Sequence, residues 1–128
     1  IQIYIMPLAN IKYAIAFNDE SAESFLKQMK IPRCVVDTTK SELATTYCGI
    51  YDSVPYVLVY AENIVNKDSV TLSDILGVLA HEAYHVTRYM TDFIGDEQPS
   101  EEFVAYSLQI VCFSFFNEYF KFKEEHSG

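Results

Sequence analysis

The hydrophobic residues of this chain are spaced in runs that predict strands and helices in alternation. The stretch Asn10 to Phe17 is rich in Ile, Tyr and Phe and predicts a strand. Residues 18–30 then place apolar side chains on one face, which predicts a short amphipathic helix capped by Asp19 or Ser21. Pro32 blocks any continuation of that helix, because the residue before a proline disfavours the helical conformation.

The middle of the chain carries one strong signal between two weaker ones. Residues 33–39 ("RCVVDTT") predict a strand, and Ser41 to Cys48 predict a turn of helix. The strongest strand signal is Pro55 to Val65, whose apolar run predicts burial on both faces for part of its length. The polar segment Asn66-Lys67-Asp68 follows it and predicts a turn.

Two long helices are predicted in the second half of the chain. Thr71 suits the N-cap of the first helix, with Asp74 three residues later as its partner in a capping box, and Gly95 suits the C-terminal end. Ser100 suits the N-cap of the second helix, which is expected to run from about Glu101 to about Lys123. The apolar stripe of the first helix consists of Leu72, Ile75, Leu76, Leu79, Val86, Met90 and Phe93.

Together these elements predict a single domain of the α+β class over residues 1–128. We expect a small mixed or antiparallel sheet of three or four strands, with the helices packed against one side of it. No apolar run reaches the ~18 residues of a membrane span, and the first residues lack the basic region of a signal peptide. The three cysteines match no disulfide framework. A cytoplasmic protein with reduced thiols and no membrane partner is therefore predicted.

The formal net charge of −9 bears on which partners the protein can bind. Binding of nucleic acid through phosphate contacts requires a basic face, so this class of function is excluded. An acidic surface does suit a protein that binds a basic partner or imitates DNA. The apolar face of the last helix leaves a homodimer through that helix open.

The segment "LAHEAYHVTRYM", Leu79 to Met90, carries the candidate chemistry. His81 and His85 lie four residues apart in a predicted helix, so their side chains point the same way and can bind one zinc ion. Glu82 lies about 100° round the helix from His81, where it can take a proton from a zinc-bound water. This HExxH pattern is typical of zinc-dependent peptidases.

A catalytic zinc needs a third protein ligand and an open position for water. His126 lies in the C-terminal tail, whereas Glu101 and Glu102 open the last helix, which can fold back along the motif helix. Glu101 heads one line of side chains on this helix and Glu102 heads another. The periodicity therefore leaves the choice between the two glutamates open.

The sequence resembles the gluzincin-type zinc peptidases, in which HExxH is followed by a glutamate on a second helix. The pairing of "HEAYH" with "EFVAY" is similar to small phage and prophage zincin-like proteins and, more distantly, to metallopeptidase domains that cleave repressors. Both groups carry Glu-x-x-Ala after the motif, and only Glu102, with Ala105, matches that spacing. The resemblance covers about Leu79 to Leu108. It implies a minimal zincin-like fold, a zinc cofactor and Glu102 as the third ligand.

Three neighbours of the motif have further roles to consider. Asp92 falls one turn beyond Arg88 and nearly in line with His85, so it can accept the free N–H of a ligand histidine or pair with Arg88. Tyr106 is the candidate for stabilising an oxyanion, as tyrosines do in several zinc peptidases.

The predicted function is a small zinc metallopeptidase that acts on a peptide or protein substrate through a water activated by Glu82. The alternative is a non-catalytic acidic protein of phage or prophage type that inhibits a host partner, with zinc structural or absent. A zinc hydrolase acting on a bond other than a peptide is the third hypothesis.

Overall fold

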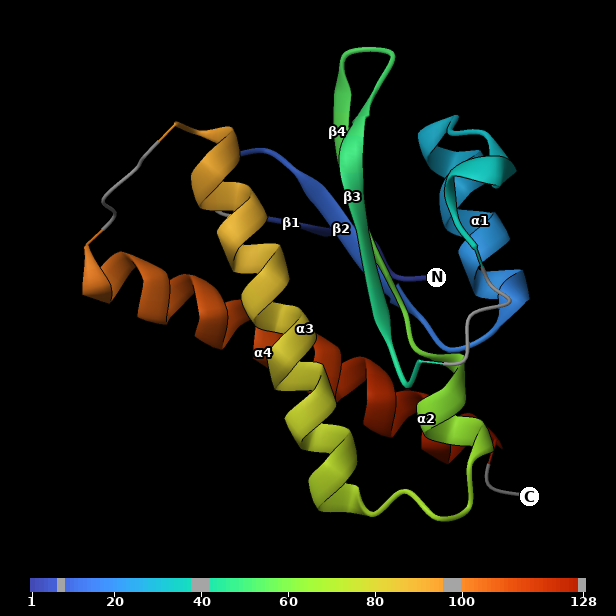
Figure 1. The fold of residues 1–128 in the computed structure, drawn as a ribbon. Coiled ribbons are helices and arrows are strands. Elements are labelled where there is room, and N and C mark those ends of the chain that lie inside the picture. The colour runs from blue at the N-terminus through green and yellow to red at the C-terminus, as the bar shows by residue number, and fades with distance from the viewer. Residues whose placement is uncertain (7–8, 38–41, 96–99, 127–128) are drawn as a thin grey trace.

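A computed structural model describes residues 1–6, 9–37, 42–95 and 100–126 (Figure 1). Its elements, in chain order, are β1 (Tyr4–Ile5), β2 (Lys12–Ala16), α1 (Asp19–Met29), the 3-10 turn η1 (Arg33–Val35), β3 (Thr45–Tyr51), β4 (Val54–Tyr60), α2 (Glu62–Asn66), α3 (Leu72–Phe93) and α4 (Glu101–His126). The predicted α+β class is confirmed, with a small mixed sheet, the HExxH helix α3 and the long C-terminal helix α4.

The four strands form one sheet in the order β1-β2-β4-β3. Strands β2 and β4 are parallel, whereas β1 pairs with β2 and β3 pairs with β4 in antiparallel fashion. The turn between β3 and β4 has two residues, Asp52 and Ser53, with φ of 50° and 66°. Two consecutive positive φ angles are those of a type I′ turn, whose twist matches a hairpin. In the described sheet, strand β3 lies at one edge, next to β4.

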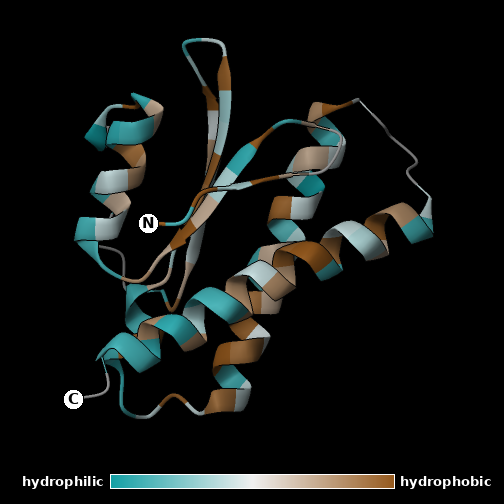
Figure 2. Ribbon diagram, turned by 180° about the vertical axis from the view of Figure 1, so that it is seen from behind, coloured by the Kyte–Doolittle hydropathy of each residue, from teal (hydrophilic) through white to brown (hydrophobic). Residues whose placement is uncertain are grey.

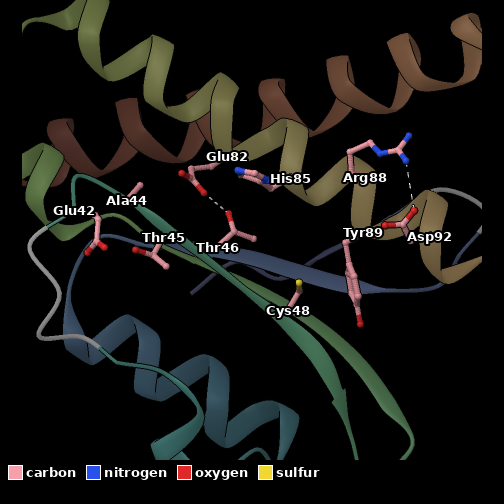
Figure 3. A pocket seen from close by; sticks show the side chains of 10 residues that line it. All are labelled: Glu42, Ala44, Thr45, Thr46, Cys48, Glu82, His85, Arg88, Tyr89 and Asp92. Atoms are coloured by element: carbon pink, nitrogen blue, oxygen red, sulfur yellow. Dashed lines mark hydrogen bonds and ion pairs between the residues drawn. The ribbon is translucent and has the colours of Figure 1, made fainter.

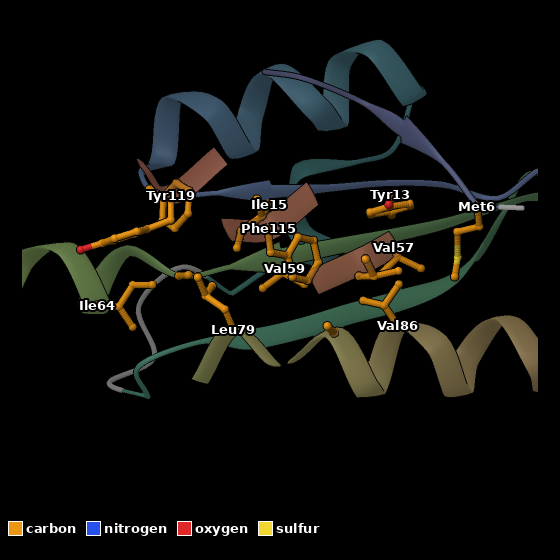
Figure 4. Packing of buried hydrophobic residues seen from close by; sticks show 14 of the residues in the cluster. Met6, Tyr13, Ile15, Val57, Val59, Ile64, Leu79, Val86, Phe115 and Tyr119 are labelled. Atoms are coloured by element: carbon orange, nitrogen blue, oxygen red, sulfur yellow. The ribbon is translucent and has the colours of Figure 1, made fainter. Parts of the chain in front are cut away.

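The central strands β2 and β4 bury side chains on both faces, because helices cover the sheet on both sides. Tyr13, Val57 and Val59 share a core with Leu79 and Val86 of α3 and with residues of α4 (Figure 4). The intervening residues Ala14, Ala16 and Leu58 pack against Phe25 and Leu26 of α1 on the opposite face. The expectation that helices cover only one side is therefore wrong.

Three local predictions are also wrong. The strand predicted over Pro55 to Val65 ends at Tyr60, because Glu62–Asn66 form the short helix α2. Residues Arg33–Val35 form η1 rather than a strand, and Arg33 Nη1 donates to the Val36 carbonyl at 2.9 Å, which closes the turn. Residues 38 and 39 of that predicted strand, and Ser41 of the predicted helical turn, lie outside the described residues. The rest of that turn leads into β3, because Thr45–Tyr51 pairs along its whole length with β4.

The predicted ends of the helices are largely confirmed. Thr71 and Asp74 form a capping box at the start of α3, and Gly95 adopts φ of +76° just beyond its last residues. At the start of α4, Ser100 Oγ accepts a hydrogen bond from the Phe103 amide at 3.1 Å. The cap of α1 is Asn18 rather than Asp19 or Ser21, since its Oδ1 accepts from the Ser21 amide at 2.8 Å.

The capping box of α3 supports a prediction about stability. Thr71→Ala removes the acceptor of the Asp74 amide and should lower the free energy of unfolding by about 1 kcal/mol. The measurement is urea unfolding at pH 7, followed by circular dichroism. Ser73→Ala is the matched control, because Ser73 is exposed in the same turn and makes no side-chain hydrogen bond within the described chain. A loss for Ser73→Ala as large as that for Thr71→Ala would contradict this explanation.

Candidate functional site

A groove runs between helix α3 and the edge strand β3 (Figure 3). Two hydrogen bonds connect its walls. Thr46 Oγ1 on β3 donates a short bond to Glu82 Oε2 on α3. Two turns further along the helix, Tyr89 Oη donates to the Gly49 carbonyl at 2.6 Å. The two bonds hold the strand at a fixed distance above one face of the helix.

The groove comprises two adjoining hollows with Glu82 at their junction. The first has a volume of about 500 Å³ and is lined by Glu42, Ala44, Thr45, Thr46, Cys48, Glu82, His85, Arg88, Tyr89 and Asp92. The second has a volume of about 590 Å³ and contains His81 together with Glu42, Ala44 and Glu82. Both volumes are in the range of sites that bind small molecules or short peptide segments. The three residues of the motif therefore border one continuous groove.

The histidine pair has the geometry that a shared metal ion requires. His81 Nε2 and His85 Nε2 are 3.1 Å apart, and both side chains are exposed to the groove side of the helix. Two nitrogens bound to one tetrahedral zinc at a Zn–N distance of about 2.05 Å lie about 3.3 Å apart. The spacing of four residues on α3 thus places two ligand atoms at nearly the separation that zinc imposes. This part of the predicted metal site fits zinc.

Glu82 differs from the histidines in its surroundings. Its side chain is buried, with a relative exposure of 6%, because it lies under strand β3. Thr46 donates to carboxylate oxygen Oε2, and this is the one hydrogen bond of the carboxylate within the described residues. One oxygen is therefore fixed by the strand, and the other is left as an acceptor beside the histidine pair.

The structure does not bring Glu102 or Tyr106 to the histidines. The apolar side chains of α4 that include Val111 and Phe115 pack into the core, which turns the opposite face of the helix to solvent. Glu102, Ala105 and Tyr106 lie on this exposed face, where they line a separate hollow. Ligation by Glu102 requires Ala105 at the contact with α3, and Ala105 is exposed instead.

The other candidates for a third ligand are also placed apart. Glu101 is exposed at the start of α4, and His126 Nδ1 lies 2.9 Å from the Phe122 carbonyl within the same helix. Among the described residues, no group of three or more His, Cys, Asp or Glu side chains is arranged to hold a metal ion. The third ligand stays a prediction, and the carboxylates that share the groove with the histidines are Glu42, Glu82, Asp92 and Asp74.

Several other residues of the groove have surroundings that the sequence does not reveal. Asp92 pairs with Arg88 at 3.6 Å, which is the local pairing considered above. Desolvation in the groove wall raises the pKa of the Cys48 thiol. Desolvation, followed by the proximity of Cys48 and Tyr56, raises the pKa of Tyr89. Both groups are therefore neutral at pH 7. Thr46 and Cys48 carry no motif, and only the pairing of β3 with β4 places them here, whereas Tyr89 belongs to α3 itself.

Comparison with known proteins adds no relative. No protein-family profile, no curated protein and no solved structure matches this chain. Within the described residues, none of the helices combines the length and the apolar character needed to cross a membrane. The geometry of the groove and the HExxH motif are therefore the features that bear on function.

Proposed function

We propose that this protein is a zinc-dependent hydrolase, a small peptidase that acts in the cytoplasm. The observation that carries the proposal is the convergence of His81 Nε2 and His85 Nε2, 3.1 Å apart, beside the buried carboxylate of Glu82. These three groups border a groove whose other wall is an edge strand. A histidine pair, a carboxylate and an elongated groove are the parts that hydrolysis of an extended substrate requires.

His81 and His85 are the residues that would hold the metal. Zinc bound there lowers the pKa of a coordinated water and polarises a carbonyl oxygen. Two protein ligands leave room for a third, which the resemblance assigns to Glu102; Glu42 is a second candidate, because it lines both hollows of the groove. Both nitrogens must be unprotonated to bind the metal, so zinc binding should weaken at acidic pH.

Glu82 is the proposed general base. In hydrolysis, the oxygen of water bonds to the carbonyl carbon, the C–N bond breaks, and a proton of the water passes through Glu82 to the leaving nitrogen. Thr46 donates to Oε2 and orients the carboxylate, which leaves Oε1 to accept that proton. Thr46 acts here as a positioning residue.

Strand β3 is the proposed platform for the substrate. In the described sheet, β3 pairs only with β4, and its other edge faces the groove (Figure 3). An extended peptide can add to such an edge through main-chain hydrogen bonds, and its alternate side chains then point toward α3. This arrangement favours a peptide over a compact small molecule as the substrate.

The experiment is an assay for peptide hydrolysis by the zinc-loaded protein. The protein is incubated with a mixed peptide library in water enriched in ¹⁸O, and the products are analysed by mass spectrometry. Hydrolysis places one heavy oxygen in each newly formed carboxyl group, so cleavage by this route is distinguished from contamination of the library by preformed fragments. Protein prepared without metal is the control. If zinc-loaded protein cleaves neither the library nor the proteins of a cell lysate, the peptidase proposal fails and the non-catalytic binding protein is favoured.

A further inference from the structure

Helix α4 has two apolar faces, and among the described residues only one of them is covered. Val111, Phe115 and Tyr119 are buried in the core beneath the sheet. The opposite face leaves four large apolar side chains in solvent, namely Tyr106 (63% exposed), Ile110 (41%), Phe113 (67%) and Phe120 (49%). Figure 2, in which α4 lies nearest the viewer, shows apolar residues along much of its first half. A helix that is apolar on both sides is usually covered on both sides.

The exposed apolar residues follow the repeat of a coiled coil. Phe103, which is half-buried and packs in part against the core, begins a line whose members are spaced three and four residues apart in strict alternation: Phe103, Tyr106, Ile110, Phe113, Asn117 and Phe120. This is the a/d spacing by which two helices pack side by side. One member, Asn117, is polar, and a single Asn at such a position is a known means of fixing register. We call these six residues the α4 seam.

We propose that the α4 seam binds the α4 seam of a second copy of this chain, with the two helices antiparallel. The a positions of the seam are Phe103, Ile110 and Asn117, and the d positions are Tyr106, Phe113 and Phe120. In the antiparallel orientation each a position lies level with a d position of the other copy. Phe103 then meets Phe120, Ile110 meets Phe113, and Asn117 meets Tyr106. Each layer occurs twice about a two-fold axis, as a symmetric interface requires. Apolar side chains fill two layers, and in the third the Asn117 amide can hydrogen-bond to the Tyr106 hydroxyl.

The charges that flank the seam favour the antiparallel arrangement. Glu101 and Glu102 open α4, whereas Lys121 and Lys123 lie near its end. Antiparallel packing places Glu102 near Lys123 of the second copy at both ends of the interface. Parallel packing would place like charges together. None of the ion pairs formed inside the described part of the chain uses these four residues, so they are available to a partner.

The interface leaves the candidate site accessible. No residue of the α4 seam lines either hollow of the groove between α3 and β3. The inference therefore stands or fails independently of the proposed hydrolase activity.

The first test is the mass in solution by sedimentation equilibrium. The chain of 14.7 kDa should approach about 29 kDa as its concentration rises to about 100 µM. Phe113→Glu places carboxylates in the two central layers and should leave a monomer with an unchanged circular dichroism spectrum. Ile50→Glu is the matched control, because Ile50 is equally exposed (61%) but lies on β3. A monomeric wild type, or a dimer broken by Ile50→Glu and not by Phe113→Glu, would overturn the proposal.

The second test determines the orientation of the helices. Glu102→Lys and Lys123→Glu should each weaken dimerisation about fivefold or more, which is about 1 kcal/mol, since each change puts like charges together at both ends. The double variant should restore the wild-type dissociation constant, because it recreates both pairs with their signs reversed. A double variant as weak as the single ones would rule out the antiparallel register.

Discussion

Replacing Glu82 by Gln is expected to abolish hydrolysis while zinc stays bound. The Gln side chain has nearly the same shape, and its amide oxygen can still accept the hydrogen bond from Thr46 Oγ1. It cannot take a proton from water at neutral pH. General-base catalysis contributes about 10²–10⁴ to the rate, so at least a hundredfold loss of turnover is expected. The measurement is kcat on the best peptide found with the library, together with the zinc content of the variant.

The matched control for this variant is Glu101→Gln. It makes the same chemical change on an exposed residue outside the groove, and turnover should stay within about twofold of the wild type. Loss of zinc from Glu82→Gln would show that this residue holds the metal. Full turnover by a zinc-loaded Glu82→Gln protein would remove Glu82 from the chemistry and end the proposed mechanism.

Double substitution of His81 and His85 by Ala is expected to remove bound zinc completely. The wild type should carry about one zinc per chain, because the two Nε2 atoms are placed for one tetrahedral ion. Metal content after gel filtration, measured by plasma mass spectrometry, tests this directly. The fold should survive the change, since both side chains are exposed on α3 and neither belongs to the core. A wild type that takes up no zinc when the metal is added would overturn the metal site.

A titration with zinc then separates the candidates for the third ligand. From the geometry we expect Glu102→Ala to leave the zinc affinity nearly unchanged, because Glu102 lies on the exposed face of α4 away from the groove. Loss of a true third ligand should weaken binding at least tenfold. Such a loss for Glu102→Ala, measured at a concentration where variant and wild type have the same mass in solution, would place Glu102 at the metal as the resemblance implies. Glu42→Ala is the comparison within the groove.

Local signals in the sequence were sufficient to predict helix α3 and the histidine pair of the candidate site. The capping box of Thr71 and Asp74 and the spacing of His81 and His85 depend only on residues within one or two turns, so the helix brings them together without help. The same holds for Ser100 at the start of α4.

The other half of the site depends on contacts between distant segments. Thr46 reaches Glu82 only because β3 pairs with β4 at the sheet edge, and the polar, Thr-rich segment has no apolar run to predict that strand. On α4 the periodicity gives two apolar lines, and nothing local indicates which line the core uses. The core uses the line that contains Val111 and Phe115, and this places Glu102 and Tyr106 in solvent. The helix α1 also covers the second face of the sheet, and β2 does not reveal this locally, because its residues 13–16 are apolar on both faces without indicating which helix packs on which face.

The order of the strands has a consequence for how the chain reaches this fold. The hairpin of β3 and β4 closes over a two-residue turn, so it can form early at a small loss of chain entropy. The parallel ladder joins Tyr13 to Val57, about 44 residues later, and cannot form until α1 and β3 have been brought into place. Non-local pairing of this kind slows folding. Docking of β2 onto a preformed hairpin is therefore the expected rate-limiting step, and the wall of the groove that carries Thr46 would be present before the core beneath it closes.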